Sequence, residues 1–169
     1  MKNVVIIVAT KNSNYTLAEN LLELIDCKKY NVELRSLEEF ELPLFLASEY
    51  DELKQKYLNE IKSITDLLVE SDALIVCAPE YNGGIPPIIT NALAWISVST
   101  DYWRDAFVNK ISLIATSSGG PAIKYNIAMK NQLEHLGMVV MPRMISVSSN
   151  NPFKKESALK ILKQFLNLI

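Results

Sequence analysis

Three short stretches of this chain carry the residue types that could hold a ligand. The first is Ala78–Pro87, in which Pro, Glu, Tyr, Asn and two Gly residues are packed together. Proline stiffens a turn, Tyr81 offers a ring face and a hydroxyl, and Gly83 and Gly84 let backbone N–H groups approach a bound molecule. This composition is more typical of a loop that lines the binding site of a flat polar ligand than of a solvent-exposed connection.

The second stretch, Thr10–Thr16, is a polar loop between an apolar segment and a segment with helical spacing of leucines. A strand, a polar loop and a helix N-terminus together bind anions, because free N–H groups and the helix dipole attract negative charge. The alternative is ordinary capping of the helix by Ser13 or Asn14. The loop lacks the glycines of the P-loop and of the dinucleotide fingerprint. The third stretch, Ser117–Pro121, is a second glycine-bearing loop.

Apolar runs and helical spacing predict the elements that position these loops. The expected strands are Val4–Val8, Asn31–Leu37, Ala73–Ala78, Lys110–Thr116, and a fifth made of Met138–Val140 and Met144–Val147, interrupted around Pro142. Helices are expected after each, including one from near Asp51 through Leu68 and a last one that begins at Asn151 and Pro152. This alternation predicts one α/β domain, residues 1–169, with a parallel sheet.

The topology predicts where the three stretches meet. Each follows a predicted strand, and ligands of such folds bind outside the carboxyl ends of the strands. We therefore expect one pocket that contacts all three loops.

Composition excludes several classes of function. The net charge is −2 and no Lys/Arg stripe is present, which argues against nucleic acid as a partner. The apolar run at the N-terminus is too short for a signal sequence or a membrane span. His135 is the single histidine, so a zinc site or a Ser-His-Asp triad has little to use. Cys27 and Cys77 are predicted to be reduced core thiols of a cytoplasmic protein.

A family resemblance adds to these inferences. Pro79–Pro86, followed by Asn91-Ala92-Leu93-Ala94-Trp95, resembles the P-E-Y-N-x-x-x-P…N-A-(I/L)-D-W signature of the NAD(P)H-dependent FMN reductase family. The rest of the chain agrees with that family in order and length. The resemblance implies a flavodoxin-like three-layer α/β/α sandwich with a five-stranded parallel sheet, with FMN as cofactor and NAD(P)H as co-substrate.

The resemblance also implies site residues, matched by position. The loop for the FMN phosphate corresponds to Thr10, Lys11, Asn12, Ser13 and Asn14. The loop against the ribityl chain and the ring corresponds to Pro79, Glu80, Tyr81, Asn82 and Gly83. The loop along the other edge of the ring corresponds to Ser117, Gly119 and Gly120. Family members usually carry an Arg in the phosphate loop, where this chain has Lys11 as the only cation. No metal and no catalytic side chain are expected, and Glu80 is expected to fix its loop as a hydrogen-bond acceptor.

The expected function is hydride transfer from NAD(P)H through bound FMN to free FMN, a quinone or a similar small acceptor. The expected assembly is a cytoplasmic homodimer or homotetramer, with neither membrane nor nucleic acid as partner. Two alternatives remain. One is a flavodoxin-like electron carrier, against which the absence of strong acidity and of a T-x-T-G-N-T-type loop argues. The other is a flavin-free regulatory dimer, which the Arg-less phosphate loop supports.

Overall fold

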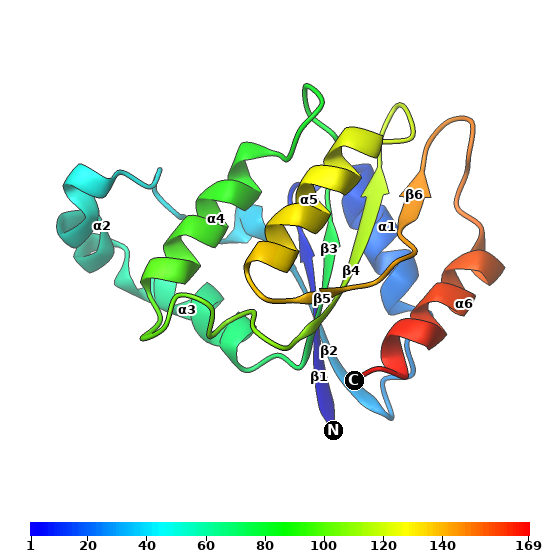
Figure 1. The fold of residues 1–169 in the computed structure, drawn as a ribbon, viewed down its shortest axis with the longest axis horizontal. Helices are drawn as coiled ribbons and strands as arrows, with labels where there is room; N and C mark the ends of the chain where they lie inside the picture. The colour runs from blue at the N-terminus through cyan, green and yellow to red at the C-terminus, as the bar shows by residue number, and fades with distance from the viewer.

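A parallel sheet forms the centre of the computed structural model, which describes residues 1–169. Its strands are β1 (Lys2–Val8), β2 (Tyr30–Ser36), β3 (Ala73–Cys77), β4 (Ile111–Ser117), β5 (Val139–Val140) and β6 (Ile145–Val147). They lie in the order β2-β1-β3-β4-β5, and β6 also pairs with β4 (Figure 1). All pairs are parallel. This order is that of flavodoxin-like doubly wound folds and confirms the predicted fold class.

The fifth position of the sheet is shared by two short strands. Val139 of β5 pairs with Ile111 at the start of β4, and Ile145 of β6 pairs with Ala115 near its end. The break between them contains Pro142, which has no N–H to contribute to a ladder. The predicted interruption of the fifth strand is therefore confirmed.

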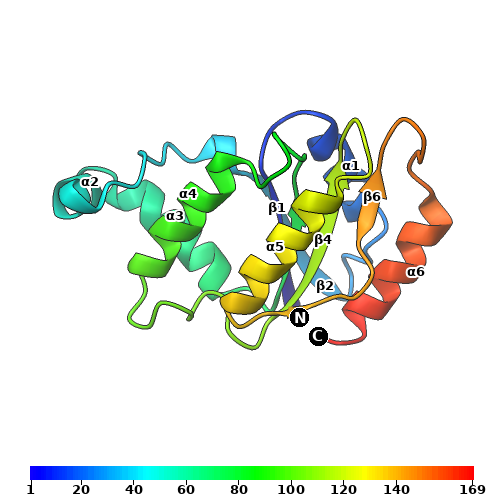
Figure 2. The same ribbon diagram turned by 45° about the horizontal axis from the view of Figure 1, so that its top comes forward.

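Helices cover both faces of the sheet (Figures 1 and 2). One face carries α1 (Ser13–Leu22) and α6 (Lys155–Leu166), and the other carries α3 (Leu58–Val69), α4 (Pro87–Val98) and α5 (Ile123–His135). Successive side chains of a strand point to opposite faces, so a central strand needs apolar residues at every position. In β1, Val4, Ile6 and Val8 enter the core under α1 and α6, while Val5 and Ile7 enter the other core.

The helix expected from near Asp51 is two helices, and this prediction was wrong. The first, α2 (Tyr50–Lys56), is separated from α3 by Tyr57, which is the C-cap of one helix and the N-cap of the other. Helix α2 buries none of its residues and extends away from the sheet (Figures 1 and 2). It is held at one end, where the Tyr50 ring stacks on Trp95 and the Tyr50 hydroxyl donates to the Val98 carbonyl. Because α2 has no apolar face to bury against the sheet, no packing contact holds it on the same axis as α3.

The start of the last helix was also mispredicted. Helix α6 begins at Lys155, with Lys154 as its N-cap. Asn151 instead exchanges two backbone hydrogen bonds with Ser148, and its side-chain amide donates to the Ser146 carbonyl at 2.7 Å. These contacts hold Asn151 in a turn after β6, so it is not available to cap a helix.

The two cysteines differ in environment. Cys77 ends β3 and is fully buried, as expected, but Cys27 is exposed in the turn after α1. The prediction of two core thiols was therefore wrong for Cys27. The apolar neighbours of Cys27 in sequence, Leu24 and Ile25, turn inward while the cysteine itself does not. None of the helices has both the length and the apolar character needed to cross a membrane.

Asp72 ties the first residues of β1 to the turn before β3. Its carboxylate accepts a hydrogen bond from the Asn3 N–H at 2.8 Å and pairs with the Lys2 ammonium at 3.0 Å. The Asn3 hydrogen bond, with help from Lys2 and against the effect of partial burial, lowers the pKa of Asp72 below its ordinary value. The ionised carboxylate therefore stabilises the fold at neutral pH.

We expect Asp72→Asn to lower the free energy of unfolding by about 1 kcal/mol at neutral pH. A lowered folded-state pKa stabilises above the unfolded-state pKa, and this stabilisation is lost as the pH falls through the folded-state value. The difference in the free energy of unfolding between wild type and variant should thus disappear below about pH 4. Urea unfolding at neutral and acidic pH measures it, with the exposed Asp51→Asn as control. A gap of equal size at both pH values would contradict this account.

Candidate functional site

The three stretches singled out in the sequence lie together at one edge of the sheet (Figure 2). They follow β1, β3 and β4, and the carboxyl ends of parallel strands share an edge. Side-chain hydrogen bonds join each stretch to another, as described below. The structure therefore brings together the residues that the sequence assigned to one pocket.

Asn14 joins the first loop to the third. Its side chain accepts a hydrogen bond from the Ser117 N–H at 2.7 Å and donates one to the Ser117 carbonyl at 2.9 Å. Asn14 is fully buried. Its second amide hydrogen donates to the Asn12 side-chain oxygen, which also accepts from the Asn14 backbone and so caps α1. The cap is thus Asn12, whereas the alternative considered from the sequence was a cap at Ser13 or Asn14, and the Asn14 amide is used in positioning.

Donors remain in the first loop after these contacts are made. The Thr10 hydroxyl is buried and has no hydrogen-bond partner within the protein. The backbone N–H of Ser13, at the start of α1, donates to no protein group. A buried hydroxyl without a partner is uncommon in native proteins and asks for an explanation. An anion bound at this helix N-terminus would provide both groups with an acceptor.

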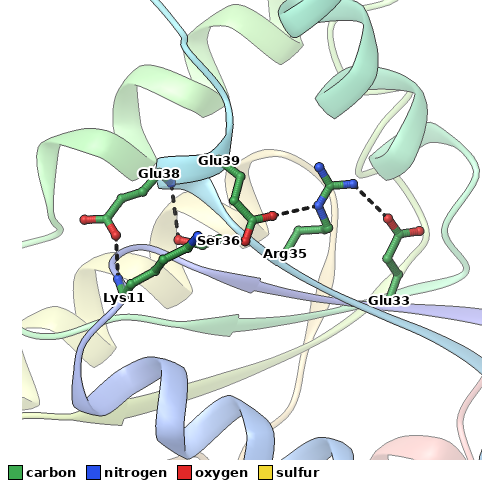
Figure 3. A network of polar contacts seen from close by, with 6 residues as sticks. All are labelled: Lys11, Glu33, Arg35, Ser36, Glu38 and Glu39. Carbon is green, nitrogen blue, oxygen red and sulfur yellow. Dashed lines mark hydrogen bonds and ion pairs between the residues drawn. The ribbon is translucent and has the colours of Figure 1, made fainter.

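Lys11, the only cation of the first loop, is already in contact with carboxylates (Figure 3). Its ammonium lies 3.3 Å from a Glu39 oxygen, and its backbone N–H donates to Glu38 at 2.7 Å. Both glutamates belong to a single 3-10 turn, η1 (Leu37–Glu39), which directly follows β2. The first loop is therefore less cationic than its sequence suggested.

The second loop closes on itself in a tight hairpin. Tyr81 and Gly84 exchange two backbone hydrogen bonds, and both residues between them, Asn82 and Gly83, have positive φ values of 50° and 72°. This is the conformation of a two-residue turn of type I′. It leaves the N–H groups of Asn82 and Gly83 without a protein acceptor. Tyr81 is 43% exposed, and its hydroxyl lies 3.5 Å from the Asn12 amide nitrogen.

Glu80 fixes the second loop to the third, as expected. Its carboxylate accepts from the Tyr125 N–H at 3.0 Å, at the N-terminus of α5, where the helix dipole favours a negative charge. Its own N–H donates to the Ser118 hydroxyl at 2.8 Å. Pro79, directly before it, is buried. The sequence analysis named Ser117 and missed Ser118; the doubled serine before two glycines was the available signal.

The third loop leaves its backbone open. A Cβ built on Gly119 or on Gly120 would meet no heavy atom within 4 Å, so a ligand can approach this backbone closely. Lys124, which the sequence analysis missed, lies across the second loop. Its side-chain Cδ is 3.1 Å from where a Gly83 Cβ would stand. The position of Lys124, three residues after the Gly119-Gly120-Pro121 turn, could have indicated from the sequence that it lies near the site.

The titratable groups beneath the loops are held neutral. Burial raises the pKa of the Cys77 thiol far above its ordinary value. Burial, with a smaller effect of Cys77, also raises the pKa of the Tyr125 phenol. No three His, Cys, Asp or Glu side chains come together in a way that could hold a metal ion. The arrangement can bind and orient a ligand through donors and open backbone, and it offers no nucleophile paired with a base.

A separate hollow of about 210 Å³ lies beside β6 and the start of α6. Its lining includes Arg143, Ser146, Asn151 and Lys154, and none of the site residues expected from the sequence. We therefore take the three loops, which share direct hydrogen bonds, as the candidate site.

The family model of the NADPH-dependent FMN reductases matches residues 1–152. The chain belongs to this family. This confirms the resemblance carried by Pro79–Pro86 and Asn91–Trp95, and it supports the predicted class of enzyme and FMN as cofactor. The orphaned Thr10 hydroxyl, the free N–H groups and the open glycine backbone fit such a phosphorylated, planar group.

The chain is also similar to individual proteins and solved structures. The flavoenzyme NAD(P)H:(acceptor) oxidoreductase FerB from Paracoccus denitrificans superposes with a TM-score of 0.78 at 21% identity, covering 99% of this chain and 97% of that one, and shares the fold. The NADH:(hydroxy)cinnamate reductase subunit CrdA of Vibrio ruber is 34% identical over 80 residues, 47% of this chain and 36% of its own length. An NADPH azoreductase of a Bacillus species is 29% identical over 93 residues, 54% of this chain and 47% of its own length. The chain thus aligns with about half or less of these two curated relatives.

We expect Gly83→Ala to destabilise the protein by about 1 kcal/mol, because an alanine is strained at this positive φ and its Cβ would press on Lys124. Gly84→Ala is the matched control. Its Cβ would meet only the Tyr81 carbonyl at 3.8 Å, and its φ is not positive. Urea unfolding of both variants measures the difference. Equal stability of the two variants would count against the strained turn.

Proposed function

We propose that this chain is an NAD(P)H-dependent oxidoreductase that binds FMN at the three loops and delivers reducing equivalents to a small acceptor. The observation that carries the proposal is the convergence of three loops at one edge of the sheet, of which the second carries the family signature and the other two match the family by position. They are joined there by Asn14 to Ser117 and by Glu80 to Ser118. The net charge of −2 argues against an electron carrier that docks on its partners by charge.

Each loop has a proposed part in holding the cofactor. Thr10 and the N–H of Ser13 bind the phosphate, with Lys11 as the nearby cation. The exposed Tyr81 ring and the free N–H groups of Asn82 and Gly83 face the ring system. The list of proposed cofactor-binding residues remains Thr10, Lys11, Asn12, Ser13, Asn14, Pro79, Glu80, Tyr81, Asn82, Gly83, Ser117, Gly119 and Gly120. Of these, Asn12, Asn14 and Glu80 are committed to contacts within the protein, so their proposed part, like that of Ser118, is to position the others.

When bound, FMN supplies the redox chemistry, since it accepts hydride from NAD(P)H and passes reducing equivalents to an acceptor. The chain's residues hold and orient the reactants. The unpaired N–H groups of the second loop would stabilise negative charge on the ring of the bound flavin. Cys77 and Tyr125 stay protonated beneath the loops, so they take no proton from the reactants.

We propose free FMN, quinones and similar small conjugated molecules as acceptors. The names of two relatives refer to a hydroxycinnamate and to azo compounds, which are also planar, conjugated molecules. The glycine-lined third loop, where no neighbour stands within 4 Å of a built Cβ, leaves room for a planar molecule to approach. The site would thus select an acceptor that is planar and small enough to reach the flavin past the third loop.

We further propose that the protein works as a homodimer or homotetramer in the cytoplasm, where NAD(P)H is regenerated. Two isoleucines of α5, Ile123 and Ile127, are 60% and 65% exposed. They adjoin a surface hollow of about 370 Å³ that Met144 and four polar residues also line. Exposed apolar side chains around a hollow are typical of surfaces that a partner covers. Helix α5 begins at the third loop, so such a partner would lie close to the site.

The test of the function is direct. The purified protein should bind FMN with a change in flavin fluorescence, and NADH or NADPH should reduce the bound flavin in stopped-flow experiments. Steady-state oxidation of NAD(P)H should then depend on an added quinone. A protein that binds FMN but is not reduced by either nucleotide would be an electron carrier. A protein that binds no FMN would be the flavin-free regulatory dimer, and the proposal would be wrong.

Thr10→Val tests the phosphate assignment. Valine has the shape of threonine, and the hydroxyl has no protein partner, so stability without flavin should be unchanged or higher by about 1 kcal/mol. FMN affinity should fall by about tenfold, because the phosphate loses a donor. Fluorescence titration measures it, and the exposed Thr16→Val is the matched control. Unchanged FMN affinity in Thr10→Val would remove Thr10 from the phosphate site.

A further inference from the structure

The surroundings of Lys11 suggest a property that the function alone does not require. We propose that Glu39 limits the preference of this site for FMN over riboflavin, because it competes with the flavin phosphate for Lys11. This inference rests on the proposed flavin site. It concerns the selectivity of that site, and it assigns a role to η1, which none of the sequence motifs contains.

The contacts of Lys11 carry the first step. Its ammonium pairs with Glu39 at 3.3 Å, and its backbone N–H donates to Glu38 at 2.7 Å (Figure 3). Two of the groups with which Lys11 could bind a phosphate, its ammonium and its amide, are therefore occupied by carboxylates. Phosphate binding through Lys11 must break or share these contacts.

The second step is that Glu39 is fixed in place and charged. Arg35 donates from Nε to Glu39 at 2.9 Å and from a second nitrogen to Glu33 at 3.1 Å (Figure 3). The Arg35 guanidinium also lies over the Phe40 ring, with 4.8 Å to its centroid. Although partial burial acts in the opposite direction, the hydrogen bonds from Arg35 and Lys11 keep the pKa of Glu39 below its ordinary value. Glu39 is therefore an anion at neutral pH.

The third step is the balance of charge. Three carboxylates, those of Glu33, Glu38 and Glu39, surround two cations, Lys11 and Arg35, in one connected network (Figure 3). The network therefore carries a surplus of negative charge before any ligand binds. A flavin phosphate brings further negative charge to the neighbouring loop, and like charges oppose each other there. Riboflavin, which has the same ring and ribityl chain without the phosphate, avoids this opposition.

The consequence is a site with a weak preference for the phosphorylated flavin. Thr10 and the N–H of Ser13 favour the phosphate, while the η1 carboxylates oppose it. We expect the dissociation constants for FMN and riboflavin to differ by less than about tenfold in the wild type. FMN held in this way exchanges with free flavin, which suits an enzyme that reduces flavin as a substrate.

The experiment compares FMN and riboflavin affinities by fluorescence titration in wild type, Glu39→Gln, and the double variant Lys11→Met with Glu39→Gln. Glu39→Gln should increase the ratio of riboflavin to FMN dissociation constants by about three- to fivefold, the range of an exposed charge pair. The double variant should return the ratio to the wild-type value or below it. Glu41→Gln is the matched control, because Glu41 is exposed two residues away and makes no ion pair. It should leave the ratio unchanged.

The riboflavin affinity serves as an internal check of folding, since Glu39→Gln should leave it unchanged. A wild-type ratio above about ten would overturn the inference. So would a ratio that Glu39→Gln leaves unchanged, that Glu41→Gln changes equally, or that stays raised in the double variant. These outcomes leave the proposed function standing, because both flavins still bind. Failure of the wild type to bind either flavin would instead overturn the proposed function and this inference with it.

Discussion

The two hydrogen bonds between the Asn14 side chain and the Ser117 backbone hold the candidate site together. Strand β3 lies between β1 and β4 in the sheet, so this contact reaches across the end of β3 and draws the first and third loops over it. The second loop leaves β3 beneath the contact and is attached to the third through Glu80 and Ser118. Because Asn14 is buried and its amide is fully used, its loss would leave the Ser117 N–H and carbonyl without partners.

The site divides its polar groups into those that hold the loops and those that stay open. Side chains do most of the holding: Asn12 caps α1, Asn14 binds Ser117, and Glu80 binds the start of α5. The open groups are mainly backbone N–H groups, together with the Thr10 hydroxyl. Backbone donors fixed by a rigid scaffold do not reorganise when charge develops on a ligand. Such a site suits chemistry that a bound cofactor supplies.

The acidic turn η1 shows how a neighbouring element changes the chemistry of a motif without belonging to it. The first loop has the composition of an anion site, yet its cation is paired with Glu39 and one of its amides with Glu38. The same contacts anchor the loop to β2 and so stabilise it. Under the proposed function, contacts that stabilise the loop and contacts that would bind a phosphate therefore compete for Lys11.

The order of strands and helices, the parallel sheet with its interrupted fifth strand, and the meeting of three loops followed from local patterns in the sequence. Apolar runs bounded by turn residues specify buried strands directly, and right-handed crossovers leave little choice of topology. The family signature indicated the class of chemistry because it is contiguous in the chain. The break at Tyr57 and the start of α6 at Lys155 escaped prediction, since packing and turn contacts decide where such polar helices begin and end.

Tertiary structure alone decided how the site residues are used. Asn14 and Ser117 are 103 residues apart, Glu80 and Ser118 are 38 apart, and Lys11 and Glu38 are 27 apart. No local pattern indicates such pairs, because each forms only when separate strands bring their loops to one edge. The sequence therefore determined which residues lie at the site, and the fold determined which of them bind each other and which stay free for a ligand.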